Sequence, residues 1–163
     1  LVMEYTLAEN FVLKSYYHPP YSNFKLLNKD IMNEHAEKLI KDFDVRAGQG
    51  SKSPAKALSG GNQQKAILGR EIDLDTDLLI AVQPTRGLDV GAIEYIHKRL
   101  VEQRDSGKAV LLVSLELDEI MDLSDRIAVI NSGELIDLVI NDDSVNEYDI
   151  GLMMAGVKRG DEQ

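Results

Sequence analysis

The chain has 163 residues, with 18 basic and 28 acidic side chains, a formal net charge of −10 and 44% hydrophobic residues. The hydrophobic content predicts a globular domain with a real core rather than a disordered chain. The acidic balance argues against general binding to nucleic acid or anionic lipid, since both select clustered Lys and Arg. The lack of Cys excludes a disulfide framework and a thiolate metal site.

The first part of the chain has helical patterns. Thr6–Glu9 predicts a capping box at a helix start, and this helix should end before Pro19-Pro20. A second helix is expected from about Asn28, with an apolar stripe of Ile31, Leu39, Ile40 and Phe43. The Gly-, Ser- and Lys-rich segment Ala47–Lys56 predicts an exposed loop. A third helix is expected from Ser59 to about Leu74.

After residue 75, apolar runs alternate with helical patterns, which is typical of a parallel α/β sheet. Strands are expected at 78–82, 109–113, 126–130 and 135–140, and helices at 90–105, 116–123 and 146–155. The first two strands are wholly apolar, which favours burial on both faces, and Asn131–Glu134 predicts a hairpin turn. We therefore predict an α/β fold with a mostly parallel sheet. Its parts would be a helical subdomain over 1–74, an α/β core over 75–156 and a frayed tail over 157–163.

A short glycine motif, Ser59-Gly60-Gly61, lies where a loop becomes a helix. Glycines let the backbone approach an anion closely, and the unpaired N–H groups at a helix start favour negative charge. A bare motif of this kind is more often a helix N-cap with flexible glycines. Only the surrounding residues can distinguish an anion-binding site from such an N-cap.

Those surrounding residues resemble the ABC ATPase family. Leu58–Lys65, with the sequence LSGGNQQK, is similar to the signature loop of bacterial importers of sugars and nucleosides. Pro84–Ala92 resembles the segment after the family's Walker B strand, and Ser124–Glu134 resembles its next landmark. Thr6–Asn10 is similar to the start of the family's helical subdomain. The resemblance covers nearly the whole chain in the correct order, and it implies a partial ABC ATPase fold of the P-loop NTPase type.

In that family, two ATPase domains pack head to tail, and the signature loop of one domain covers the γ-phosphate held by the other. The resemblance therefore implies contact with a partner's nucleotide through Ser59, Gly60, Gly61, Asn62 and Gln63, and a place at the dimer interface for Asp89. ATP and Mg²⁺ would be cofactors of the full-length assembly. Neither is expected to bind tightly to this chain alone.

Several parts of the family's own active site are missing or replaced. No G-x-x-x-x-G-K-[ST] phosphate loop occurs, and no buried strand leads into Gly48–Ser53. The chain is therefore expected to be a fragment that begins after that loop. A Walker B strand ordinarily ends in Asp-Glu, which hold Mg²⁺ and the attacking water. Val82 and Gln83 stand at these positions, and Leu115 stands where a switch His is common. Together the three replacements indicate lost hydrolysis, with no catalytic residue and no metal ligand in the chain.

The leading hypothesis is a longer protein with two cassettes, in which this chain is the later part of the second, degenerate cassette. The expected partners are the first cassette of the same or a second chain, transmembrane permease subunits contacted by residues 1–57, and indirectly a substrate-binding protein, with no nucleic acid. The parent protein would hydrolyse ATP in the cytoplasm, as a peripheral protein on the inner face of the bacterial cell membrane. This chain alone would be inactive.

Two other functions share the Ser-Gly-Gly motif. One is a non-catalytic interaction or regulatory module that keeps only the ABC interface. The other is a chromosome or DNA-repair ATPase, which predicts long heptad repeats and basic patches that this sequence lacks. By resemblance, Gln83 and Leu115 favour a nucleoside importer slightly over a sugar importer.

Overall fold

The computed structural model describes residues 1–24 and 26–157. The chain divides into two compact units. The first comprises Leu1–Leu79 and Pro84–Leu111, and the second comprises Ile80–Gln83 and Leu112–Gln163. Each unit has its own cluster of buried hydrophobic side chains. The predicted division at residue 74 stays a prediction, and the expected fraying of 158–163 lies outside the described residues.

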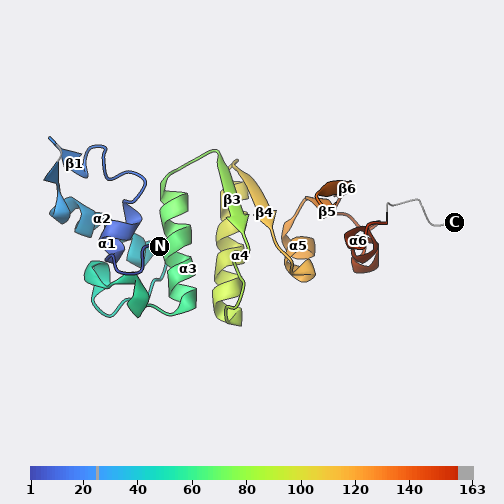
Figure 1. Ribbon diagram of the computed structural model, residues 1–163, viewed down its shortest axis with the longest axis horizontal. Coiled ribbons are helices and arrows are strands. Elements are labelled where there is room, and N and C mark those ends of the chain that lie inside the picture. Colours follow the sequence, from blue (N-terminus) through green and yellow to red (C-terminus); the bar gives the residue numbers. More distant parts are fainter. Residues whose placement is uncertain (25, 158–163) are drawn as a thin grey trace. The chain divides into compact units, whose positions relative to one another are not determined.

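The first unit is mainly helical (Figure 1). Its elements are α1 (Leu7–Phe11), the short hairpin of β1 (Ser22–Asn23) and β2 (Leu26–Leu27), α2 (Lys29–Asp42), two 3₁₀ turns (Gly50–Lys52 and Ala55–Ala57), α3 (Gly60–Asp73) and α4 (Val90–Asp105). The predicted capping box is confirmed, because Thr6 N–H donates to Glu9 Oε2 at 2.8 Å and Glu9 N–H donates to Thr6 Oγ1 at 3.2 Å. Asn28 caps α2 by accepting from Ile31 N–H.

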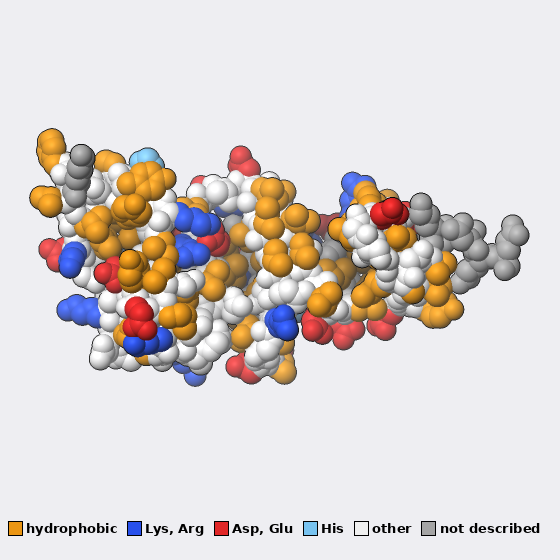
Figure 2. Space-filling view, in the orientation of Figure 1, with side chains coloured by type: hydrophobic (Ala, Val, Ile, Leu, Met, Phe, Trp, Pro, Cys, Tyr) orange, Lys and Arg blue, Asp and Glu red, His pale blue; other side chains and the backbone are white. Residues whose placement is uncertain are grey.

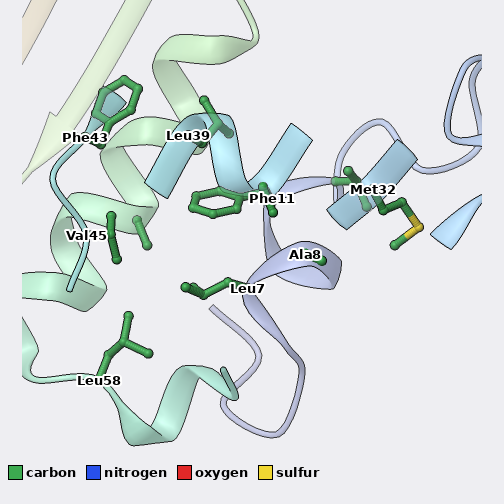
Figure 3. Packing of buried hydrophobic residues seen from close by; sticks show 11 residues of the cluster. Leu7, Ala8, Phe11, Met32, Leu39, Phe43, Val45 and Leu58 are labelled. Atoms are coloured by element: carbon green, nitrogen blue, oxygen red, sulfur yellow. The ribbon is translucent and has the colours of Figure 1, made fainter. Parts of the chain in front are cut away.

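The core of the first unit lies between α1, α2 and the residues before α3. Figure 3 shows Leu7, Phe11 and Leu58 directed into a common interior. On α2 the predicted stripe is confirmed for Leu39 and Phe43, and the half-buried Ile40 packs against the same cluster, whereas Ile31 is half-buried and lies outside it. The buried face is Met32, Ala36, Leu39 and Phe43. Their spacing of three and four residues places all four on one side of the helix.

The segment Ala47–Lys56 is not the exposed loop that its composition predicts. Ser51, Ser53 and Ala55 are buried. The segment runs beside the start of the chain, where Leu7 N–H donates to the Ser53 carbonyl and Ala55 N–H donates to the Tyr5 carbonyl, both at 2.9 Å. These bonds satisfy backbone groups that a buried loop would otherwise leave unpaired, and the small Ser and Ala side chains allow the two segments to approach closely.

Two strands, β3 (Leu78–Val82) and β4 (Ala109–Val113), pair with each other, and α4 connects them. Ala109 N–H donates to the Asp77 carbonyl at one end of the pair, and Gln83 N–H donates to the Val113 carbonyl at the other. The strands therefore run in the same direction, as the predicted strand–helix–strand order requires.

The prediction that these strands are buried on both faces is wrong. On β3, Leu79 and Ala81 are buried while Leu78, Ile80 and Val82 are exposed. Figure 2 shows hydrophobic side chains at the surface over β3 and β4. A wholly apolar run does not report which faces are covered, because side chains alternate along a strand and each face needs its own packing layer. Within the described residues, only one face of β3 has such a layer.

The second unit contains α5 (Leu117–Leu123), β5 (Arg126–Asn131), β6 (Glu134–Ile140) and α6 (Glu147–Met154). β5 and β6 form the predicted antiparallel hairpin. Ser132 and Gly133 at its turn both have positive φ, 50° and 83°, which matches the twist that two-residue hairpin turns need. The buried residues here are Ile127, Val129, Val139, Val145, Ile150 and Met153.

One buried polar side chain organises the start of the first unit. Asn10 is 0% exposed. Its Oδ1 accepts from Val2 N–H at 2.7 Å, and its Nδ2 lies 3.0 Å from the Val2 carbonyl, 3.2 Å from that of Tyr5 and 3.0 Å from that of Thr6. A single amide therefore satisfies backbone groups of three residues that precede or start α1.

Asn10→Asp should destabilise the first unit by roughly 2–4 kcal/mol. The variant has the same shape but loses both amide donors and turns a carboxylate towards three carbonyl oxygens. Urea unfolding followed by circular dichroism measures the change. Asn33→Asp, the same replacement at a half-exposed position of α2, is the control and should change stability by about 0.5 kcal/mol or less. Equal losses in the two variants would contradict the role given to Asn10.

Candidate functional site

The signature loop (Leu58–Lys65) contains the start of α3. Ser59 is the N-cap residue, with extended φ and ψ of −64° and 159°, and both Ser59 and Gly60 are exposed. The first turn of a helix leaves backbone N–H groups without intrahelical partners. The Ser59 side chain makes no cap hydrogen bond to these groups. The predicted loop-to-helix transition is confirmed, and its backbone donors are accessible to an anion.

The second glycine of the motif brings α3 against α4. A Cβ built on Gly61 would lie 3.3 Å from the Cβ of Ala92 and 4.0 Å from Asp89 Oδ2. Asp89 is the N-cap of α4, and its Oδ1 accepts from Ala92 N–H at 2.9 Å. The fold thus brings the signature loop and Asp89 together. The sequence indicated both as interface residues but contained no signal of their proximity.

Gln63 holds the residues that lead into the signature loop. Its side-chain Nε2 donates to the Leu58 carbonyl at 3.0 Å and lies 3.3 Å from the Ala55 carbonyl. The nucleotide contact expected for Gln63 stays a prediction. Its amide N–H groups are directed at the chain's own backbone, so its observed contribution is to shape the loop.

The 3₁₀ turn before the loop is held from the other side by α2. Glu37 Oε1 accepts from Ser51 N–H at 2.7 Å. Hydrogen bonds from the backbone and the side chain of Ser51 lower the pKa of Glu37 from its ordinary value of 4.5, because they favour the ionised carboxylate. Gly50 has a φ of 55°, and a Cβ there would lie 2.5 Å from Glu37 Oε1. The positive φ and this close approach both favour glycine at position 50.

Two cations hold the C-terminal end of α2 against α3 and α4. Lys65 Nζ donates to Asp44 Oδ2 at 2.8 Å and lies 4.5 Å from the centre of the Tyr95 ring. The hydrogen bond from Lys65 lowers the pKa of Asp44. Arg99 on α4 donates through Nη2 to the Asp42 carbonyl at 2.8 Å. Positive charge at a helix C-terminus is stabilising, so these contacts orient the helices that carry the site.

The three positions that the sequence predicts to be replaced lie in the second unit. Val82 ends β3 and is 63% exposed, and Leu115 is 73% exposed. Gln83 has a φ of 49°, and its backbone N–H is bonded to Val113 as described above. Neither apolar side chain can attract a metal ion or its waters, and the Gln83 amide cannot accept a proton as a general base. Residues 1–24 and 26–157 contain no cluster of three or more His, Asp or Glu able to hold a metal ion.

No family model matches the chain. It is 58% identical over 156 residues to the guanosine import ATP-binding protein NupO of Bacillus subtilis (strain 168) and 55% identical over 156 residues to the nucleoside import ATP-binding protein NupA of Lactococcus lactis subsp. cremoris (strain MG1363). Each alignment covers 96% of this chain and 30% of the relative. The glucose import ATP-binding protein TsgD13 of Haloferax volcanii is 44% identical over 152 residues, which are 93% of this chain and 28% of the relative. The chain therefore spans less than a third of the length of these relatives.

Solved structures agree in fold. A nucleotide-free ATP-binding cassette from an ABC transporter matches with a TM-score of 0.70 and 20% identity, over 87% of this chain and 58% of that one. A dimeric bacterial ABC transporter cassette matches with a TM-score of 0.70 and 22% identity, over 87% and 59%.

The fold and the signature loop thus define part of an ATP-binding cassette of the ABC class. The chain belongs to the ABC ATP-binding proteins, and its relatives include import ATP-binding proteins named for nucleosides and sugars.

Among the helices in the part of the chain that the structure describes, none is long and apolar enough to cross a membrane.

Gly61→Val should lower the stability of the first unit by about 1–3 kcal/mol, because the new side chain forces α3 away from Ala92. Gly60→Val is the matched control, since a Cβ at Gly60 meets nothing within 4 Å. Both variants place a β-branched residue in the first turn of α3. The difference between their urea unfolding midpoints therefore isolates the contact with α4. Equal midpoints would mean that α3 and α4 do not pack through Gly61.

Glu37→Gln should lower stability at pH 6 and lose that effect in acid. Because the folded-state pKa of Glu37 lies below 4.5, its ionised form stabilises the fold fully above about that pH. The stabilisation disappears as the pH falls through the folded-state pKa. The gap between the unfolding midpoints of wild type and variant should therefore close as the pH falls below about 4.5. Glu34→Gln, at an exposed position of the same helix, is the control. A gap that stays constant with pH would contradict the bond from Ser51.

Proposed function

We propose that this chain is part of the ATP-binding subunit of an ABC importer and supplies the signature loop to an ATP site on a partner cassette. The observation that carries the proposal is the exposed start of α3 at Ser59 and Gly60, where the Ser59 side chain makes no cap hydrogen bond to the backbone donors. The surrounding contacts are directed inward and hold the loop in shape, so these donors are left to face a partner.

The chemistry at this position would be electrostatic. ATP held by the partner's phosphate loop presents its γ-phosphate, on which negative charge is spread during transfer to water. The first-turn N–H groups of α3 and the Ser59 hydroxyl are donors that can be aimed at those oxygens without reorganising. The chain would supply this stabilisation and close the site, while the partner supplies the groups that hold Mg²⁺ and activate water.

The chain's own Walker B region would take no part in hydrolysis. Val82 cannot hold a metal-bound water, Gln83 cannot act as a base, and Leu115 cannot hydrogen-bond to a phosphate. The assembled protein would then have one site that turns over ATP and one that only binds it or serves as a scaffold. ATP and Mg²⁺ belong to the assembly in this proposal, and the chain alone would bind neither tightly.

Identity to relatives supports a nucleoside as the transported substrate. It is higher to the two proteins named for guanosine and nucleoside import than to the one named for glucose import. The subunit would work on the cytoplasmic face of the cell membrane, bound to transmembrane permease subunits through residues 1–57. A substrate-binding protein would act with it indirectly.

In the full-length protein with its permease, Ser59→Arg should reduce ATP turnover by about 100-fold or more, because the longer cation fills the space that the phosphate needs. Restoring the Walker B pair with Val82→Asp and Gln83→Glu should change turnover much less. Phosphate release under saturating Mg-ATP measures both effects.

The matched control is Ser106→Arg, the same replacement at an exposed position after the end of α4. It should leave turnover close to that of the wild type. Unchanged turnover in Ser59→Arg would sink the proposal and favour a non-catalytic interaction module instead.

A further inference from the structure

A second amide in the signature loop, that of Asn62, bridges two parts of the chain. Asn62 is half-buried in the first turn of α3. Its Oδ1 accepts from the backbone N–H of Arg46 at 2.7 Å, and its Nδ2 lies 2.9 Å from Ser59 Oγ. Arg46 follows the C-terminal end of α2. The amide is therefore anchored at one end to the α2 side of the unit and at the other to the exposed serine.

The direction of the second bond follows from the first. A backbone N–H can only donate, so the amide atom that faces Arg46 must be the oxygen. The atom that faces Ser59 is then the NH₂ group, which can only donate. Ser59 Oγ is the acceptor in this pair, and its own hydrogen has to be directed away from Asn62.

This arrangement differs from an ordinary serine N-cap. There the hydroxyl oxygen accepts from the N–H of the second or third helical residue, which consumes one backbone donor. Here Ser59 Oγ makes no cap hydrogen bond to the backbone of α3, and it accepts from the Asn62 amide. The Ser59 hydroxyl hydrogen is therefore left for an external acceptor, and the Ser59 oxygen consumes none of the first-turn N–H groups.

We propose that Asn62 is a positioning residue that fixes the Ser59 hydroxyl as a hydrogen-bond donor towards an anionic ligand. The proposal rests on the proposed function, in which that ligand is the γ-phosphate of a nucleotide on the partner cassette. Asn62 would act through Ser59 and would not have to touch the nucleotide itself.

Asn62→Asp tests the direction of the bond with little change of shape. One carboxylate oxygen still accepts from Arg46 N–H, but the other can only accept, so the Ser59 hydroxyl turns towards it and stops donating to the phosphate. In the full-length protein with its permease, ATP turnover at saturating Mg-ATP should fall at least about tenfold. Gln49→Glu, an amide-to-carboxylate change at an exposed position outside the signature loop, is the control for added negative charge and should have a much smaller effect.

The decisive measurement is the same replacement in a Ser59→Ala background. If Asn62 acts through the serine hydroxyl, Asn62→Asp should cost little further turnover once that hydroxyl is gone, so the two changes are non-additive. An equal fold-loss with and without Ser59 would overturn the positioning role, as would unchanged turnover in Asn62→Asp alone.

A different result would show that the proposed function, and not only the positioning role of Asn62, is wrong. If Ser59→Arg left turnover unchanged, the contact between the loop and the phosphate would be refuted, whereas unchanged turnover in Ser59→Ala alone would refute only the hydroxyl contact that Asn62 is proposed to fix. Where Asn62→Asp lowers the unfolding midpoint strongly, Asn62→Ala removes the same donor without adding charge. Its non-additivity with Ser59→Ala is then interpreted by the same criterion.

Discussion

The geometry of the first unit depends on the need to satisfy the backbone of an irregular, buried segment. The residues that lead into the signature loop form no long helix or strand, so their polar groups require partners from elsewhere. Asn10 fixes the start of the chain through its buried amide. That fixed segment then bonds to Ser53 and Ala55, and Glu37 holds the same region from α2. The position of the signature loop is therefore decided by side chains far from it in sequence.

In the signature loop, the side-chain amides bond within the chain, while the residues at the start of α3 are exposed to solvent. The amides of Asn62 and Gln63 are directed at the chain's own backbone and at Ser59. Ser59 and Gly60 are exposed, and Gly61 permits the close approach of α4. The amide side chains of Asn62 and Gln63 thus hold the loop in shape, while the small residues Ser59 and Gly60 leave the start of the helix exposed. This division suits a loop that meets a ligand held by another domain, because the donors must be rigid before that ligand arrives.

In the function that we propose, the two units of this chain contribute unequally to the chemistry of an ATP site. The first unit has well-placed hydrogen-bond donors for an anion. In the second unit, Val82 and Leu115 are exposed and apolar, and the Gln83 side chain cannot act as a general base. In the function that we propose, the chain acts as a contributor to another cassette's site. This difference between the two units follows from the side chains present in each.

Local features could be predicted from the sequence, because they depend on neighbours within a few residues. The capping box at Thr6, the strand–helix–strand order, the hairpin turn at Ser132 and the transition at Ser59 belong to this group. The family resemblance was also readable in the linear motif, and identity to relatives confirms it.

Tertiary structure alone decided which polar groups are buried and what they bond. Composition predicted an exposed loop at Ala47–Lys56 and two-sided burial of β3, and both predictions were wrong. The same holds for the burial of Asn10 and for the bridge from Arg46 through Asn62 to Ser59. Each of these features requires contact between segments distant in sequence, or a packing layer that a strand's own residues do not specify. Local propensity contains no information about such contacts, because their free energy comes from partners that only the folded chain brings within reach.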